Sequence, residues 1–173
     1  KYPDYYCKPV GGEGSLDSKI CLIGLAPGLH GANRTGIPFT SDFSGDVIRS
    51  LLKELSINDI FITNVVRCYP EKNKPKASVI NNCQRYNNIE IGNLSNIRVI
   101  ISLGAIAYYQ ILKLYNICGI SNKFEHGKIT KLNKKISLIS SYHCSKLNFN
   151  TKKINKKMLK NIFTKAKEIT ENG

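Results

Sequence analysis

The sequence lacks long apolar runs. In its 173 residues, no stretch approaches the roughly 18 to 20 consecutive apolar residues that cross a bilayer. The first four residues also lack the apolar core of a secretory signal peptide. A hydrophobic content of 42% is still enough to bury a core of ordinary size. These features predict one soluble cytoplasmic domain over residues 1–173, without a membrane partner and by default a monomer.

The sequence also lacks an ordered cysteine pattern. Its six cysteines lie at positions 7, 21, 68, 83, 118 and 144, with no regular spacing and no CxxC pair. Secreted disulfide frameworks and ordinary zinc knuckles need such spacing, so both classes are disfavoured. We therefore expect reduced thiols in a cytosol. Cys21 lies within an apolar run and is expected to be a small core residue.

Acidic residues are scarce. Only 12 Asp and Glu oppose 26 Lys and Arg, which gives a formal net charge of +14. Much of this excess lies after Lys113, where Glu125, Glu168 and Glu171 are the only acidic side chains. A large positive charge favours a polyanionic partner through counterion release and long-range steering, and nucleic acid is the first candidate. The alternative explanation for the positive charge is an AT-rich genome, whose codons favour Lys, Asn and Ile throughout the chain.

Short apolar runs alternate with helical patterns along the chain. Strands are predicted at 19–24, 59–66, 98–104 and 135–141, and helices at 44–55, 77–91, 105–115 and from about 151 onward. This alternation predicts a three-layer α/β/α domain with a central, mainly parallel four-stranded sheet and right-handed crossovers. Ligands bind at the carboxyl ends of such strands, so we expect a site in the loops after the first, second and fourth strands.

These loops carry the unusual residues. The loop over 24–40 is rich in Gly and Pro and also holds His, Asn, Arg and Phe, but it has neither the GxGxxG pattern of dinucleotide sites nor a Walker lysine. The segment 141–151 places His, Ser and Asn before a helix whose N-terminus could bind phosphate. Asn64 lies at the end of the strand between them.

Three segments resemble the uracil-DNA glycosylase superfamily, and within it the iron–sulfur branch called family 5. They read GLAPGLHGANRTGIPFTSDFSGD at 24–46, FITNVVRCYPEKNKP at 61–75 and SYHCSKLNFNT at 141–151. Family 4 would carry an acidic residue in place of Leu25. The resemblance spans nearly the whole chain. It implies a nucleoid-associated or cytoplasmic DNA-repair enzyme that hydrolyses the N-glycosidic bond of uracil, and of some deaminated purines such as hypoxanthine, in DNA.

The resemblance also implies that water is positioned in an unusual way. Ala26, expected to lie against the base, stands where classical members carry an aspartate that orients water. Another polar group must serve. Asn33 is the candidate, and Asp42 and Asp46 are the less favoured alternatives. A strong nucleophile is not needed, because breaking the bond produces an oxocarbenium-like sugar and an anionic base.

Other roles follow from the matching motifs. Phe39 would stack on the base after it has been rotated out of the helix, a contact worth about 1 to 3 kcal/mol. Asn64 would read the base edge through its amide, and His143 would stabilise the anion of the departing base as a catalytic residue. The residues expected to hold DNA phosphates are Ser145, Asn148 and Thr151.

The family's [4Fe–4S] cluster is bound by an upstream CxxC pair and by two cysteines that flank the loop after the second strand. Cys68 and Cys83 match the second pair. The first pair is absent from the sequence. We expect it upstream of Lys1; the alternatives are that Cys7 substitutes or that the cluster has been lost.

Two other functions remain open. One is a non-catalytic or cross-linking protein that binds uracil-containing DNA, suggested by Ala26 and by Cys144, which stands where relatives carry Pro or an aliphatic residue. The other is a small-molecule hydrolase or nucleotide-binding α/β protein whose basic charge reflects genome composition.

Overall fold

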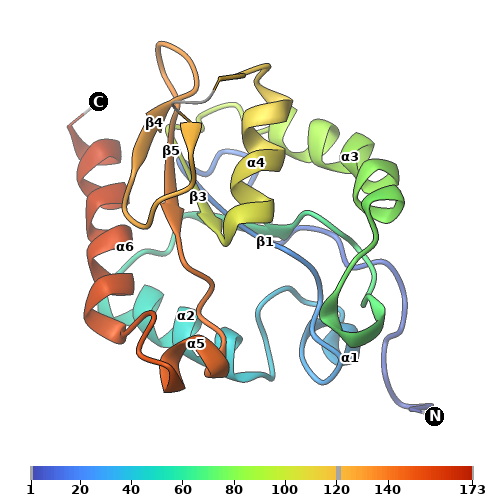
Figure 1. Ribbon diagram of the computed structural model, residues 1–173. Coiled ribbons are helices and arrows are strands. Elements are labelled where there is room, and N and C mark those ends of the chain that lie inside the picture. The colour runs from blue at the N-terminus through green and yellow to red at the C-terminus, as the bar shows by residue number, and fades with distance from the viewer. Residues whose placement is uncertain (1, 120–121, 173) are drawn as a thin grey trace.

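A computed structural model describes residues 2–119 and 122–172 of the chain (Figure 1). Its sheet has five strands in the order β2-β1-β3-β5-β4. The strands are β1 (Ile20–Gly24), β2 (Ile60–Asn64), β3 (Val99–Leu103), β4 (Ile129–Lys131) and β5 (Ser137–Ser141). All neighbouring pairs are parallel except β4 and β5, which are antiparallel. The mainly parallel α/β fold is thus confirmed.

The prediction of four strands was wrong by one edge strand. The missing strand, β4, contains only three residues, two of which are exposed. The four predicted strands are instead buried at every position. Strands covered on both faces appear as continuous apolar runs in a sequence, whereas a short, exposed edge strand leaves no such signal.

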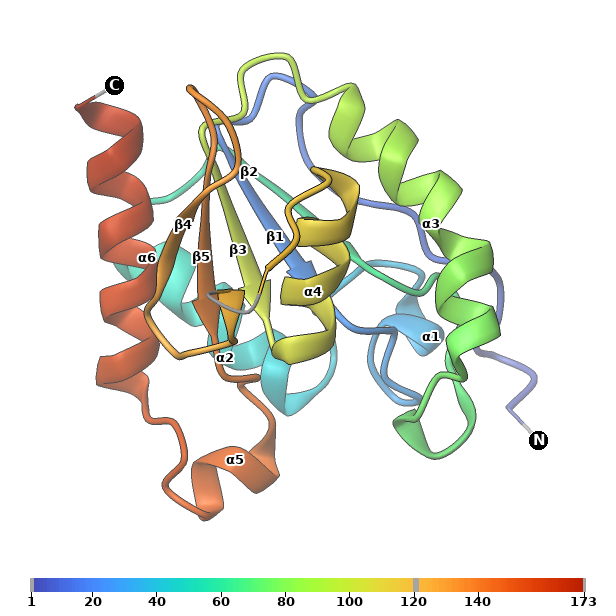
Figure 2. The same cartoon turned by 45° about the horizontal axis from the view of Figure 1, so that its top comes forward.

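Helices cover both faces of the sheet (Figure 2). One core packs α2 (Phe43–Glu54) and α6 (Lys156–Glu171) against side chains such as Leu22 and Ile101. The other packs α3 (Ala77–Gly92) and α4 (Ala105–Leu114) against the opposite sides of the same strands. Alternate residues of each strand point to opposite faces, so each of the four buried strands supplies residues to both cores.

Three short helices lie in segments that we had expected to be irregular. They are α1 (Ala32–Thr35), the 3-10 turn η1 (Glu71–Asn73) and α5 (Lys146–Asn150). The carboxyl ends of the parallel strands point toward α1 and α5 (Figure 2). The segments after β1, β2 and β5 therefore meet at one edge of the sheet, as expected for a ligand site in this architecture.

Among the described residues, no helix combines the length and the apolar character needed to cross a membrane.

Candidate active site

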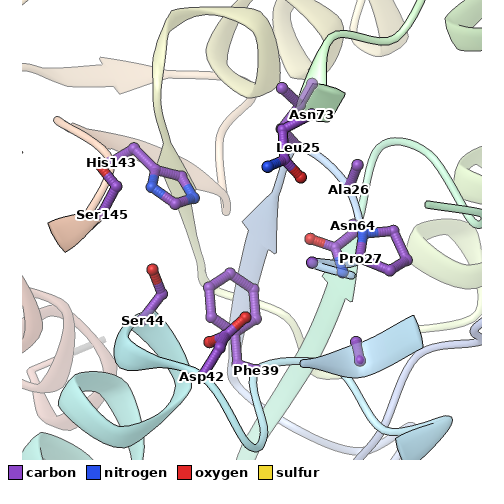
Figure 3. Close-up of a pocket in the computed structure, with 12 residues that line it drawn as sticks. Leu25, Ala26, Pro27, Phe39, Asp42, Ser44, Asn64, Asn73, His143 and Ser145 are labelled. Atoms are coloured by element: carbon purple, nitrogen blue, oxygen red, sulfur yellow. The ribbon is translucent and has the colours of Figure 1, made fainter. Parts of the chain in front are cut away.

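A cavity of about 330 Å³ opens at the carboxyl ends of the strands (Figure 3). This volume lies within the usual range for small-ligand pockets, roughly 300 to 1,000 Å³. Its lining residues come from the segments after β1, β2 and β5: Leu25, Ala26, Pro27, Gly28, Ala32, Phe39, Asp42, Ser44, Asn64, Asn73, His143 and Ser145. Six residues singled out from the sequence thus line one cavity: Ala26, Phe39, Asp42, Asn64, His143 and Ser145.

Phe39 forms one side of the cavity and is held in a strained backbone conformation. Its φ is +53°, in the left-handed region that residues with a side chain seldom adopt. The Arg49 side chain braces this turn, because its Nε donates to the Phe39 carbonyl (3.2 Å) and its Nη2 to the Pro38 carbonyl (3.0 Å). Arg49 is in turn paired with Glu13. The Arg49–Glu13 pair therefore supports the turn that carries the Phe39 ring.

Gly24 allows Phe39 and Asn64 to approach each other. A Cβ atom at Gly24 would lie 2.6 Å from the Phe39 ring and 2.6 Å from Asn64 Oδ1. Real Cβ atoms do not approach heavy atoms so closely, so only glycine fits at the end of β1. The small residue thus lets an aromatic face and an amide converge on one cavity.

Asn64, the last residue of β2, carries a buried acceptor. Only 3% of the residue is exposed, and its Oδ1 has no hydrogen-bond partner among the described residues. Leaving a buried polar atom unpaired costs about 1 to 3 kcal/mol. Figure 3 shows this oxygen directed into the cavity. The arrangement suits a ligand that supplies an N–H donor.

A buried polar network lies behind the end of β2 and holds it in place. Arg67 pairs with Glu90 (2.8 Å) and donates to Thr63 Oγ1 (2.5 Å), while the Thr63 hydroxyl donates to Glu90 (2.7 Å). Asn87 accepts from Arg67 (2.6 Å) and donates to the Val65 carbonyl (2.9 Å). This network was not predicted from the sequence, since its members lie on β2, on the segment after it and on α3, and their contacts depend on how these elements pack.

His143 faces the cavity from the segment after β5 (Figure 3). Burial lowers the pKa of its imidazole below the usual 6.5, although the negative charge of Asp42 acts in the opposite direction. The ring is consequently neutral at pH 7 and has one N–H to donate. Its backbone carbonyl accepts from Asn148 Nδ2 (2.8 Å).

The three residues predicted to bind phosphate are engaged in local bonds. Ser145 lines the cavity and its hydroxyl accepts from the Asn148 backbone N–H (3.3 Å), capping α5. The Asn148 amide holds His143, and Thr151 Oγ1 donates to the Leu147 carbonyl (2.9 Å). α5 is only five residues long. Their predicted phosphate contacts remain a prediction, with Ser145 the best placed of the three.

The structure places the candidates for orienting water in different surroundings. Asn33 does not line the cavity; its Nδ2 donates to Cys7 Sγ (3.6 Å). Asp46 is exposed on the first turn of α2. Among the described residues that line the cavity, Asp42 is the only carboxylate, and its Oδ1 accepts from Gly45 N (2.8 Å), which caps α2. Of the three, Asp42 is the one that reaches the cavity.

The Asp42 carboxylate fits against a glycine pair in the loop after β1. A Cβ atom at Gly28 would lie 2.7 Å from its Oδ2, and one at Gly31 would be closer still. These glycines were noted in the sequence only as part of a Gly-rich loop. Asn73 and Ser44, which also line the cavity, were not singled out. Asn73 has a φ of +56°, in keeping with the tolerance of asparagine for this region.

The cysteines fall into two groups. Cys68 is exposed, Cys83 is partly exposed, and the pKa of Cys68 is raised by burial and by the nearby Cys83. Cys21 and Cys144 are fully buried, and burial raises both their pKa values to about 12. Thiols of this kind are unreactive, so the buried Cys144 beside His143 does not favour the cross-linking alternative.

The structure contains two thiols that suit the predicted [4Fe–4S] cluster. Cys68 and Cys83 lie close enough to interact and are accessible, which fits one half of a four-cysteine site. Within 2–119 and 122–172, no group of three or more His, Cys, Asp or Glu side chains could hold a metal ion. Cys7 contacts Asn33 rather than joining the other two, so the structure gives no support for its substitution.

Comparisons with known proteins agree with this geometry. The sequence model of the family described as the uracil DNA glycosylase superfamily matches residues 12–167. The type-5 uracil-DNA glycosylase of Thermus thermophilus is 35% identical over 95% of this chain and 82% of its own length. The corresponding Mycobacterium bovis protein is 36% identical over 95% and 68%. A type-4 uracil-DNA glycosylase of Saccharolobus solfataricus is 32% identical over 92% and 74%. The match to the family covers most of the chain and includes every segment that lines the cavity, so this chain belongs to the uracil-DNA glycosylase superfamily.

Proposed function

We propose that this protein removes uracil from DNA by hydrolysing the bond between base and deoxyribose, the first step of base-excision repair. The observation that carries the proposal is a single cavity that brings together an aromatic face, an unpaired buried amide oxygen and a neutral histidine. These groups can hold a flat base, read its edge and stabilise its anion. The relatives named as uracil-DNA glycosylases support the same substrate.

Base recognition would rest on Phe39 and Asn64. Stacking on Phe39 would hold the rotated base, and the unpaired Oδ1 of Asn64 would accept the N3–H of uracil while the amide nitrogen donates to O4. Cytosine presents the opposite pattern, because its N3 is an acceptor and its N4 a donor. Mismatched polar edges in a buried site are strongly disfavoured. Hypoxanthine offers an N–H beside a carbonyl as uracil does, which supports it as a second substrate.

Bond cleavage would use His143 and Asp42. As the C1′–N1 bond breaks, its electron pair moves to the base, and the neutral His143 donates a hydrogen bond to the uracil O2 on which charge develops. The Asp42 carboxylate would orient water toward C1′ and accept its proton, and it would also stabilise the positive sugar. Water thus adds to C1′, and uracil leaves as an anion that is then protonated by solvent.

DNA contacts would surround the cavity mouth. Lys72 and Lys74 flank the lining residue Asn73, and both are exposed. With the net charge of +14, exposed lysines beside the cavity suit a phosphate backbone. We expect the affinity for DNA to fall steeply as salt is raised.

A [4Fe–4S] cluster would use Cys68 and Cys83 as two of its four ligands. When bound, it would crosslink the segment after β2 to α3 and so support the loop that carries Asn73. In the full natural chain, we expect the iron content to fall in Cys68→Ser and Cys83→Ser variants. A Cys118→Ser variant, which removes another exposed thiol, should keep its iron. Equal iron in all three would contradict the assignment.

The proposed activity is tested with labelled oligonucleotides that carry one uracil or one hypoxanthine, developed with alkali after incubation with the full natural chain. We expect strand cleavage at uracil, and its loss in an Asn64→Ala variant. The matched control is Asn58→Ala, which changes an exposed asparagine before the other end of β2. Tight binding to uracil-containing DNA without cleavage would instead support a non-catalytic binding protein.

A further inference from the structure

The ring of His126 is fixed behind the backbone that leads to His143. His126 Nδ1 accepts the Tyr142 backbone N–H (3.2 Å), and the His126 and Tyr142 rings stack with their centroids 5.2 Å apart and an angle of 9° between their planes. Tyr142 directly precedes the histidine that faces the cavity. His126 itself does not line that cavity. His126 therefore contacts the residue that precedes His143 and not the cavity in which a ligand would bind.

The segment that carries His126 is itself rigidly attached to β5. Gly127 N donates to the Ser140 carbonyl (2.7 Å), and Ser140 N donates to the Lys128 carbonyl (3.0 Å). The Ser140 hydroxyl donates to the Glu125 carbonyl. Ser140 is fully buried. The residues on either side of His126 are thus bonded to β5, the strand that ends immediately before Tyr142.

The bond to Tyr142 requires one protonation state. An imidazole nitrogen accepts a hydrogen bond only when it carries no proton, so His126 must be neutral with its proton on Nε2. Burial lowers the pKa of His126, which favours this state. The charged groups around it come from its own segment, from α6 and from the turn between α5 and α6. They are Glu125 and Lys128 beside it in the chain, Lys165 and Glu168 in the groove that it shares with α6, and Lys153 over the Tyr142 ring (4.9 Å).

We propose that His126 is a positioning residue for the glycosylase reaction: its neutral ring fixes the Tyr142 backbone and so sets the place of the His143 imidazole. This inference rests on the proposed function, because it assigns His143 to the leaving base. Displacing a reacting group by as little as about 1 Å can slow a reaction roughly a hundredfold. Protonation of His126 removes the acceptor for the Tyr142 backbone N–H. Acid should therefore release the Tyr142 backbone independently of any change at His143.

Two substitutions separate hydrogen bonding from packing. His126→Phe keeps a flat ring for stacking on Tyr142 but has no acceptor. His126→Asn places an amide oxygen close to the position of Nδ1 but loses the ring and cannot be protonated near neutral pH. The matched control is Tyr109→Phe, because the Tyr109 hydroxyl accepts another backbone N–H nearby, that of Phe124 (3.2 Å), whereas the Tyr142 backbone N–H donates to His126.

The first readout is kinetic. We expect His126→Phe to slow single-turnover excision about tenfold to hundredfold at pH 8 with little change in affinity for uracil-containing DNA, whereas His126→Asn and Tyr109→Phe stay within a few-fold of the parent rate. A Phe variant that excises at the parent rate would overturn the inference. So would Phe and Asn variants that are equally slow, because packing alone would then explain the loss.

The second readout is hydrogen exchange at the Tyr142 amide, which does not depend on catalysis. Protection should be lost in His126→Phe and kept in His126→Asn. In the parent it should fall as acid protonates His126, and in His126→Asn it should not. If the parent protein fails to excise uracil, the proposed function fails while this measurement still tests the contact. Protection that is unchanged in His126→Phe would refute the contact itself. Should the Phe variant not fold, the comparison of parent and Asn variant across pH remains decisive.

Discussion

The side of the cavity that carries Phe39 and Asn64 is braced by charged pairs, whereas the segment that carries His143 is braced by neutral hydrogen bonds. Behind the first side, Arg49 pairs with Glu13 and Arg67 pairs with Glu90. Behind the second, the supports are the Asn148 amide and the His126 imidazole. The two sides line one cavity, but we expect the bonds that support them to depend differently on pH.

This difference follows from the ionisation of the side chains. The ion pairs behind Phe39 and Asn64 contain no histidine. Imidazoles change state near neutrality. Mild acid should therefore disturb the side that carries His143 while leaving the side that carries Phe39 and Asn64 in place.

The largest expected effect comes from His143. A His143→Ala variant loses the proposed donor to the departing base, and removing one such donor costs roughly a hundredfold to a thousandfold in rate. Affinity for uracil-containing DNA should change little, since Phe39 and Asn64 remain. Single-turnover excision and DNA binding measure the two quantities separately. A parallel loss of both would mean that the two sides do not divide the work in this way.

A large effect on stability is expected at Glu90. In Glu90→Ala the Arg67 guanidinium, whose side chain is 5% exposed, loses its partner, and breaking a buried pair costs about 3 kcal/mol. The control is Glu171→Ala, which removes an exposed pair with Lys167 of 3.9 Å. Such a pair contributes about 0 to 1 kcal/mol. Urea denaturation measures both variants, and similar values for the two would show that the charged brace does not hold the base-reading side.

A smaller effect is expected when the aromatic face is removed. Phe39→Ala should weaken binding of uracil-containing DNA by about 1 to 3 kcal/mol, the contribution of one stacked base. The control is Phe43→Ala, because Phe43 is exposed and its ring contacts Phe149 outside the cavity. Fluorescence anisotropy gives both affinities. If Phe43→Ala weakened binding as much as Phe39→Ala, stacking in the cavity would not be the source of affinity.

The smallest expected effect is a shift in the titration of His143. Burial lowers its pKa below 6.5 and the Asp42 charge partly restores it, so Asp42→Asn should lower the pKa further. In the parent, excision should hold steady as pH falls to 6.5 and decline only below it, when His143 gains a proton. NMR titration of the His143 ring measures the shift. Asp46→Asn removes an exposed carboxylate from the same helix and should leave the pKa unchanged.

Much of the fold and part of the candidate site could be predicted from the pattern of apolar residues and from strand direction. β1, β2, β3 and β5 are buried on both faces, and this requirement writes continuous apolar runs that are visible without any structure. Residues at the ends of parallel strands necessarily meet at one edge, which is why Phe39, Asn64 and His143 could be placed together before their contacts were known.

Other features depended on contacts between segments far apart in the chain. Asn33 and Asp42 both lie in the loop after β1, and nothing in their spacing shows that Asn33 points to Cys7 while Asp42 reaches the cavity past Gly28 and Gly31. The position of Asn73 at the cavity likewise depends on the turn that carries it. Loop direction is set by packing, for which a linear pattern carries no signal.

The sequence by itself determined the mainly parallel sheet and the edge where a ligand site was expected, because strands buried on both faces appear as continuous apolar runs and parallel strands end at one edge. The candidate base-binding residues came from the resemblance to the family. Only the tertiary structure decided which carboxylate enters the cavity, which thiols are buried and which side chains support each side of the cavity. Those properties depend on distance, burial and charge in three dimensions, as the contacts of Arg67 with Glu90 and of His126 with Tyr142 demonstrate.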